Sequence, residues 1–228
     1  MLRIRLAASG KEVAVLDASE FKAVVEQYGP TVNALKRYLA QKHFRKRFSR
    51  FQFRILRQGD IQEMEDDESI TPPVDLQLIL MNHMPPDEER DARFIESCKA
   101  GRVDEVEQSL KALQNPNAVS DRDPALARAA KKGLQEVVRL LLEAGADTEC
   151  RDALEYTALH WASGNGETEV ARILLDFDAD KDAVDRLCRS PLHLAALNDH
   201  TDIVQLLLDS GAERDKETQN PGIRGVLH

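Results

Sequence analysis

The stretch Thr157-Ala158-Leu159-His160-Trp161-Ala162 has a counterpart 33 residues later, which begins Ser190-Pro191-Leu192-His193. The same interval relates Leu126 to Leu159 and Leu192, and it relates Ala129 to Ala162 and Ala195. A fixed interval that is sustained over three units is the sequence signature of a repeat protein. One unit of this length cannot bury its apolar face alone, so we expect the units to stack on one another.

Each unit contains two predicted helices. In the first helix, Leu159 and Ala162 lie on one face, because residues three positions apart are neighbours on a helix. The second runs from about residue 168 to residue 177 and has apolar residues at helical spacing. Gly145 and Gly211 follow this helix in their units and fit a left-handed helix stop, whereas Asp178 fills the third such position less comfortably.

The repeated stretch resembles the ankyrin repeat family, whose hallmark Thr-Pro-Leu-His corresponds to residues 157–160 and 190–193. The resemblance covers roughly residues 87–228 and implies an all-α solenoid. Residues 124–127 are a degenerate copy of the hallmark. Residues 94–101 look like part of a first repeat, with the polar outer face that a terminal cap needs.

The resemblance also implies repeat bounds and one departure from the family pattern. We expect about four repeats over residues 91–217, the first one a cap, and an incomplete repeat or tail over residues 218–228. The turn glycine of the family is replaced, and each replacement is expected to cost about 1 kcal/mol where a positive φ is kept. The replacing residues are Arg122, Glu155 and Cys188.

The first part of the chain, residues 1–84, has a different pattern. Apolar residues alternate in four short segments, which predicts four strands. A segment with near-helical spacing follows Thr31, a suitable N-cap residue. The predicted strands are Leu2 to Leu6, Val13 to Leu16, Phe51 to Ile55 and Leu76 to Leu80, and the predicted helix is Thr31 to Phe44.

The order of these elements resembles the β-grasp fold of ubiquitin. The resemblance does not extend to conjugation, because the chain continues through residues 81–83 instead of ending in a free Gly-Gly tail. We therefore expect an α+β β-grasp domain over residues 1–84 and a Pro-containing linker over residues 85–90. An all-α ankyrin-repeat solenoid is expected to follow.

The charge is distributed unevenly along the chain. There are 31 Lys and Arg and 40 Asp and Glu, a net charge of −9. Residues 1–86 have a balance of +2 and residues 87–228 a balance of −11, which argues against nucleic acid as the partner of the whole chain. The basic-aromatic run at residues 42–57 leaves three interpretations open. It packs its phenylalanines inside, it meets an acidic protein partner, or it contacts RNA or an acidic lipid surface.

No motif in the chain predicts catalysis, a cofactor or a bound metal. The run Asp178-x-Asp180-x-Asp182 begins like a calcium loop, but Ala183 stands where glycine is needed and Arg189 where a bidentate Glu is needed. His160 and His193 recur at one repeat position, which favours a structural hydrogen bond to the turn backbone over catalysis. We therefore expect a protein that is not an enzyme.

The sequence also bears on the compartment. Three cysteines without short spacing fit a reducing environment. No apolar run follows Arg3 and Arg5, so no signal peptide is expected. The longest apolar stretches are far below the ~20 residues of a membrane span. We expect a cytoplasmic or nuclear protein without a membrane partner.

The resemblance implies where a partner binds, because partners of ankyrin repeats contact the turn tips and the exposed side of each first helix. The corresponding residues are Asp121, Asp123, Lys131, Lys132, Leu154, Tyr156, Asn165, Arg186, Leu187, Arg189, Leu197 and Asn198. Four of them are apolar where a merely soluble surface would carry charge, namely Leu154, Tyr156, Leu187 and Leu197. The alternative is that each of these side chains only shields its neighbour in the stack.

Two unlike domains without catalytic residues indicate an interaction protein. We expect a scaffold or adaptor that binds a protein partner through the repeat surface. Two alternatives remain open. One is an adaptor linked to the ubiquitin–proteasome system, which rests on fold analogy alone. The other is a regulatory fragment of a larger enzyme.

Overall fold

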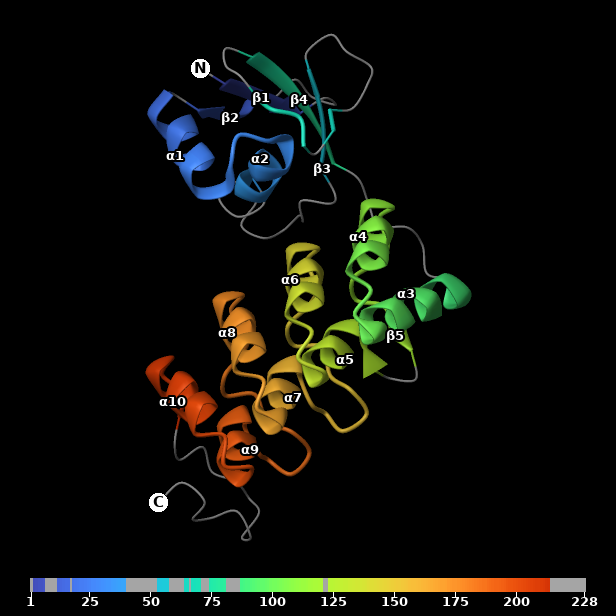
Figure 1. Cartoon of the computed structure of the whole chain (residues 1–228), viewed down its shortest axis with the longest axis vertical. Helices are drawn as coiled ribbons and strands as arrows, with labels where there is room; N and C mark the ends of the chain where they lie inside the picture. Colours follow the sequence, from blue (N-terminus) through green and yellow to red (C-terminus); the bar gives the residue numbers. More distant parts are fainter. Residues whose placement is uncertain are drawn as a thin grey trace. The chain divides into compact units, whose positions relative to one another are not determined.

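The computed structural model of the chain describes residues 2–6, 12–16, 18–39, 53–57, 64–65, 67–70, 74–80, 87–120 and 123–213. The chain divides into two compact units, with the main boundary between Met84 and Pro85 (Figure 1). The first unit contains a sheet and two described helices, and the second contains helix pairs.

The sheet of the first unit has four strands in the order β2-β1-β4-β3. The strands are β1 (Leu2–Leu6), β2 (Glu12–Leu16), β3 (Phe53–Arg57) and β4 (Val74–Leu80). β1 pairs antiparallel with β2 and parallel with β4, and β3 pairs antiparallel with β4. The alternating apolar residues therefore mark real strands, and their inward-facing members, such as Ile4, Ile55 and Leu76, are buried.

Two helices, α1 (Ala18–Tyr28) and α2 (Val32–Tyr38), complete the described part of this unit. Thr31 caps α2 as predicted, with its hydroxyl oxygen accepting a hydrogen bond from the amide of Ala34 at 3.4 Å. α1 was not predicted, although its apolar residues have helical spacing. They are Phe21, Val24, Val25 and Tyr28. The predicted end of α2 at residues 40–44, and residues 42–52 of the basic-aromatic run, lie outside the described residues.

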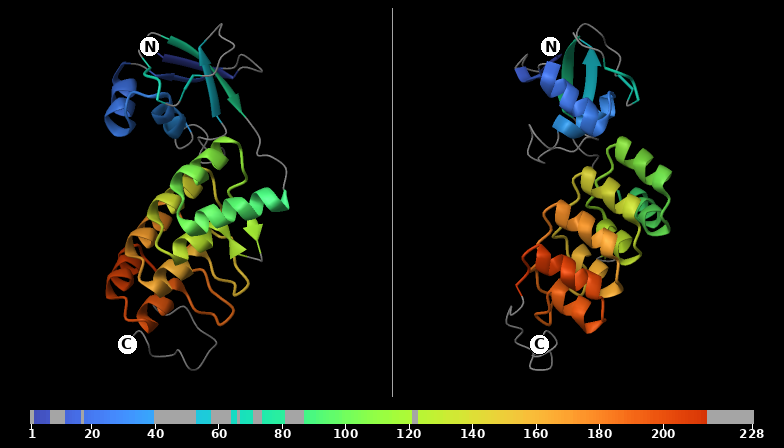
Figure 2. Two further views of the ribbon diagram at one scale, coloured as in Figure 1. Left: turned by 45° about the vertical axis from the view of Figure 1, so that its right-hand side comes forward. Right: turned by 60° about the vertical axis from the view of Figure 1, so that its left-hand side comes forward.

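The second unit is a stack of helix pairs in chain order (Figure 2). The first helices of the pairs are α3 (Glu88–Ala100), α5 (Ala125–Lys131), α7 (Ala158–Asn165) and α9 (Pro191–Leu197). The second helices are α4 (Val103–Lys111), α6 (Gln135–Glu143), α8 (Thr168–Asp176) and α10 (Thr201–Asp209). α5, α7 and α9 begin 33 residues apart, as do α6, α8 and α10, so the interval seen in the sequence sets the fold of this unit.

Small and branched residues alternate inside the stack. Ala129, Ala162 and Ala195 are fully buried and, with no side chain beyond Cβ, allow the first helices of neighbouring repeats to approach closely. Leu126, Leu159 and Leu192 are also buried one turn earlier. Each such leucine contributes roughly 1.5–3 kcal/mol through its removal from water, and this contribution exists only when the neighbouring repeat is in place.

A turn, which we call a finger, precedes the first helix of each repeat from the second onward. In the second repeat, the finger is a short hairpin of β5 (Val119–Ser120) and β6 (Asp123–Pro124). In the third, the amide of Asp152 donates to the carbonyl of Tyr156 at 3.0 Å. Asp185 and Arg189 repeat this hydrogen bond in the fourth, so the fingers of the third and fourth repeats share one backbone plan.

Left-handed backbone occurs where the repeat pattern predicts it. Gly145, Gly211 and Asp178 have φ of 87°, 81° and 60°, as expected for the helix stops. Glu155 and Cys188 have φ of 64° and 58° in their fingers. The positive φ of the family's turn glycine is therefore kept without the glycine at these two positions. The third replacement, Arg122, lies outside the described residues.

Replacing Cys188 with Gly is expected to raise the free energy of unfolding by about 1 kcal/mol, because glycine adopts a positive φ without the clash of a Cβ atom. Urea denaturation measures the change. The matched control is Cys150→Gly, since the φ of Cys150 is not positive, and that change should leave the protein no more stable than before. A Cys188→Gly protein that is less stable than the parent would show that the finger carries no such strain.

Candidate functional site

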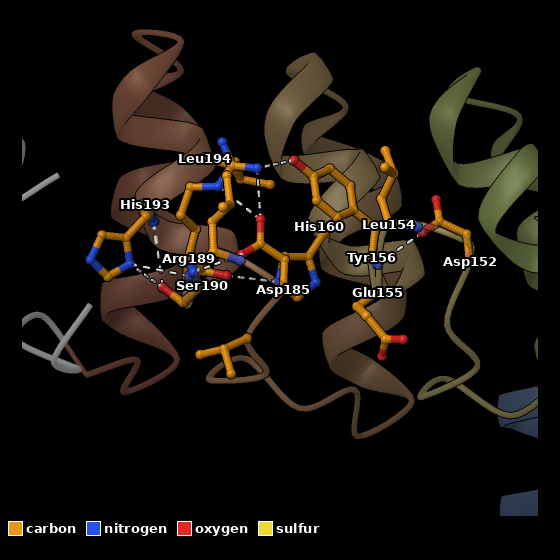
Figure 3. A network of polar contacts seen from close by, with 12 residues as sticks. Asp152, Leu154, Glu155, Tyr156, His160, Asp185, Arg189, Ser190, His193 and Leu194 are labelled. Atoms are coloured by element: carbon orange, nitrogen blue, oxygen red, sulfur yellow. Dashed lines mark hydrogen bonds and ion pairs between the residues drawn. The ribbon is translucent and has the colours of Figure 1, made fainter. Parts of the chain in front are cut away.

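Two buried aspartates fix the fingers of the third and fourth repeats (Figure 3). Oδ1 of Asp152 accepts hydrogen bonds from the amides of Leu154 and Tyr156 at 2.8 and 2.9 Å. Oδ1 of Asp185 accepts from the amides of Leu187 and Arg189, both at 2.8 Å. Each carboxylate thereby satisfies two amides of a tight turn, so the residue at the tip has a fixed backbone.

The second oxygen of each carboxylate has a different donor in the two fingers. Oδ2 of Asp152 accepts from the indole nitrogen of Trp161 at 2.8 Å. Oδ2 of Asp185 accepts from Nε of Arg189 at 2.8 Å and lies 2.7 Å from a terminal guanidinium nitrogen of the same side chain. This terminal nitrogen also donates to the hydroxyl of Tyr156. The pair formed by Asp185 and Arg189 therefore connects the fourth finger to the third.

The histidines of the repeated stretch have the structural role that the sequence predicts. Nδ1 of His160 accepts a hydrogen bond from the amide of Thr157 at 3.2 Å, and Nδ1 of His193 accepts from the amide of Ser190 at 3.2 Å. The Thr and Ser hydroxyl oxygens accept from the histidine amides in return, which completes a capping box at the start of α7 and of α9.

His160 is held in its neutral form. Nδ1 faces an amide donor, so the proton of the ring is on Nε2, which donates to the carbonyl of Arg189 at 3.1 Å. Burial lowers the pKa of His160 to about 4, although the Arg189 carbonyl and the charge of Asp185 act in the opposite direction. Burial lowers the pKa of His193 as well, again against the charge of Asp185. Neither histidine is suited to proton transfer near neutral pH.

An aromatic cluster lies beside the third finger. The rings of Tyr156 and His160 are stacked with centroids 5.4 Å apart, and the ring of Trp161 is tilted against Tyr156 at 5.0 Å. The ammonium group of Lys131, from the preceding repeat, lies 3.8 Å from the centroid of the Trp161 ring. Such a cation–π contact contributes about 0.5–1 kcal/mol at an exposed site, so Lys131 helps to hold two repeats together.

Other predicted binding residues also connect neighbouring repeats. Nζ of Lys132 donates to the carbonyl of Lys99 at 3.1 Å, and Nδ2 of Asn165 donates to the carbonyl of Lys131 at 2.8 Å. Both side chains satisfy carbonyls near the end of the preceding first helix, where no intrahelical donor remains. Lys132 and Asn165, which were predicted to bind a partner, thus form hydrogen bonds between neighbouring repeats.

Five further residues of the predicted binding set lie exposed at the surface. Leu154, Leu187 and Leu197 are 51%, 49% and 51% exposed. Arg186 and Asn198 are exposed as well, and Nδ2 of Asn198 donates to a carbonyl of its own helix. We call Leu154, Leu187 and Leu197 the exposed leucines. The first two hold equivalent positions in successive fingers, and the third lies at the end of α9.

Two predicted residues lie in the second finger. The carboxylate of Asp123 pairs with the guanidinium of Arg128 at 3.2 Å, so its charge is balanced within the repeat. Asp121 lies outside the described residues.

Sequence reasoning missed two residues that organise this surface, namely Asp152 and Asp185. The two aspartates occur 33 residues apart at one repeat position, and this recurrence was a usable signal for a structural role. Trp161 was expected to pack against the next repeat rather than to contact a ligand, and its ring lies against Tyr156 of its own repeat and the ammonium group of Lys131 in the preceding one.

The described residues contain no group of three His, Cys, Asp or Glu side chains arranged to hold a metal ion. None of the described helices is long and apolar enough to cross a membrane.

Comparison with known proteins identifies the helix pairs from α5 to α10. Residues 126–220 match the family model of ankyrin repeats in three copies. No curated protein matches the chain. Ankyrin repeats are modules of protein–protein interaction, and the match spans the fingers that carry Leu154 and Leu187. Residues 126–220 therefore form an ankyrin-repeat module for protein–protein interaction.

Proposed function

We propose that the chain is a non-enzymatic scaffold or adaptor that binds a protein partner through the exposed leucines. The observation that carries this proposal is the exposure of Leu154 and Leu187 at equivalent tips of successive fingers. A leucine in contact with water loses the favourable free energy that it would gain by burial, about 25 cal/mol per Å². Large apolar side chains that recur at one exposed position are typical of a binding surface.

The fingers are built to present these side chains without reorganisation. The amides of Leu154 and Leu187 are each held by a buried aspartate at 2.8 Å. A partner therefore binds tips whose backbone is already ordered, and the entropy cost of ordering a loop on binding is avoided. The contact between Arg189 and Tyr156 fixes the two fingers relative to each other.

The test replaces all three exposed leucines with Glu. The full-length variant is expected to lose capture of the specific partner from a cell lysate, because each Glu would have to be desolvated against an apolar partner surface. Mass spectrometry of parent and variant captures measures the loss. An unchanged set of captured proteins would show that the exposed leucines are not the binding surface.

In a matched control variant, three Glu residues are introduced into second helices instead of at the exposed leucines. Val103, Gln135 and Thr201 are exposed first residues of α4, α6 and α10. The triple change of these residues to Glu places each carboxylate at a helix N-terminus, where it is tolerated. This control should capture partners as the parent protein does, and circular dichroism should show that both triple variants keep their helices.

We further propose that the first unit is a ubiquitin-like β-grasp domain. The strand order β2-β1-β4-β3, with the first and last strands parallel in the centre, supports this proposal. A ubiquitin-like domain favours a second candidate function, an adaptor linked to the ubiquitin–proteasome system. The same capture experiment tests the candidate, since proteasome subunits retained by the triple leucine variant would have bound elsewhere on the chain.

We propose the cytoplasm or the nucleus as the compartment, where thiols stay reduced. All three cysteines are free thiols, and burial raises the pKa of the Cys98 thiol to about 12. That thiol is therefore protonated and unreactive at neutral pH.

A further inference from the structure

The repeat unit separates its charges between two sets of segments. The second helices and the loops after them, at residues 135–149, 168–182 and 201–213, contain three basic and twelve acidic residues. The fingers and first helices, at residues 119–132, 151–165 and 184–198, contain seven basic and five acidic residues. Over these three repeats, the excess of acidic residues therefore arises from the second helices and not from the segments that carry the exposed leucines.

Three of the five acidic residues of the finger segments have partners within the fold. Asp152 and Asp185 are buried, and each accepts hydrogen bonds from two amides of its own finger. Asp123 pairs with Arg128 at 3.2 Å. The carboxylates of Asp152 and Asp185 are buried and that of Asp123 is paired, so these three repel an acidic partner less than free exposed carboxylates would. Of the other two acidic residues, Glu155 is half-buried and Asp121 lies outside the described residues.

Several basic residues of the same segments remain at the surface. Arg186 is exposed and directly precedes Leu187 at the tip of the fourth finger. Lys131 and Lys132 are exposed at the end of α5. The polar contacts of these lysines are with an indole ring and a neutral carbonyl, and neither contact cancels a positive charge.

We propose that the exposed leucines, together with Arg186 and the other exposed basic residues of the finger segments, bind an acidic protein segment that carries apolar side chains. This inference rests on the proposed function and names the chemistry of the partner. Leu154 and Leu187 occur one repeat apart, so a straight segment with apolar residues at intervals contacts both. Carboxylates of that segment pair with Arg186, whose guanidinium binds a carboxylate through two parallel hydrogen bonds.

The acidic second helices direct an acidic segment to the finger side of the repeats. Their excess of acidic residues repels an acidic segment, while the finger side attracts it and increases the rate of encounter. A basic partner would have the opposite preference. Nucleic acid is also acidic, but it has no apolar side chains to cover the leucines, so a protein segment fits the observations better.

The test selects peptides from a displayed random library with the full-length protein as bait. We expect enrichment of peptides that combine Asp or Glu with Leu, Ile or Phe. The tightest peptide, labelled with a fluorophore, is then titrated against the protein while polarisation is recorded. Arg186→Gln is expected to weaken its binding about tenfold, as loss of one charge-assisted hydrogen bond does, and added salt should weaken binding to the parent protein.

The matched control is Arg139→Gln, which removes one exposed positive charge from α6. It should change the affinity far less than Arg186→Gln does. The Leu187→Ala variant separates apolar from ionic attraction and should also lose affinity. A selection without enriched Asp and Glu, or one that yields no peptide, overturns this inference.

The proposed function would survive either of those outcomes, because lysate capture tests it separately. Binding of a single-stranded oligonucleotide as tightly as the selected peptide would also overturn the inference, since the leucines would then contribute nothing.

Discussion

Replacing Asp185 with Ala is expected to lower the free energy of unfolding by about 3–5 kcal/mol, the cost typical of breaking a buried ion pair from one side. Its carboxylate is buried and accepts from two finger amides and from the Arg189 guanidinium. After the change, these donors have no acceptor, and the guanidinium is left beside Tyr156 without its counter-charge. Urea denaturation monitored by the fluorescence of Trp161, the single tryptophan of the chain, measures the loss.

Two comparisons isolate the cause of this loss. Asp176→Ala removes an exposed carboxylate from α8 and should change stability by no more than about 0.5 kcal/mol. The Asp→Asn change keeps an acceptor for the amides but removes the charge. It should therefore cost more at Asp185, whose partner is an arginine, than at Asp152, whose partner is an indole. Equal costs at the two positions would show that the ionic partner contributes little.

The free energy of unfolding is expected to fall by about 3 kcal/mol through His160 as the pH is lowered from about 6.5 to about 4. The folded state holds this ring neutral, because its Nδ1 accepts from the amide of Thr157 and the ring is buried. In the unfolded chain the ring has its ordinary pKa and takes up a proton within this range. The unfolded state then binds more protons than the folded state, so acid favours unfolding.

The variant His160→Gln tests the assignment. Glutamine at this position of a capping box accepts from the N-cap amide as the histidine does, but it does not titrate. The variant should therefore show a shallower loss of stability between pH 6.5 and pH 4 than the parent protein. The same slope in both proteins would show that His160 does not cause the acid sensitivity.

The repeats could be predicted from the sequence because their stability comes from contacts at one fixed interval. The left-handed φ of Asp178, Glu155 and Cys188 was predictable for the same reason. The interval gives equivalent positions but not the partner of each side chain. Arg189 and Tyr156 were both predicted as binding residues, yet they bind each other across two fingers, and only the stacking of repeats brings them together.

The missed helix α1 has a different explanation. Its apolar residues are spaced like those of any amphipathic helix, so this helix could have been predicted from the local sequence. The exposure of Leu154, Leu187 and Leu197 agrees with the prediction of apolar surface residues. Their role in binding stays a prediction.

The pairing of β1 with β4 has a consequence for synthesis of the chain on the ribosome. Leu2 lies opposite Val74 and Leu6 opposite Leu78, so the central pair of the sheet forms only after the end of β4 has emerged. Until then, β1 has only β2 as a neighbour, and a two-stranded hairpin is marginally stable in water. The repeats contact their nearest neighbours along the chain and add one by one as they emerge. During synthesis, β1 thus waits longer for its central partner than a repeat helix waits for the next repeat.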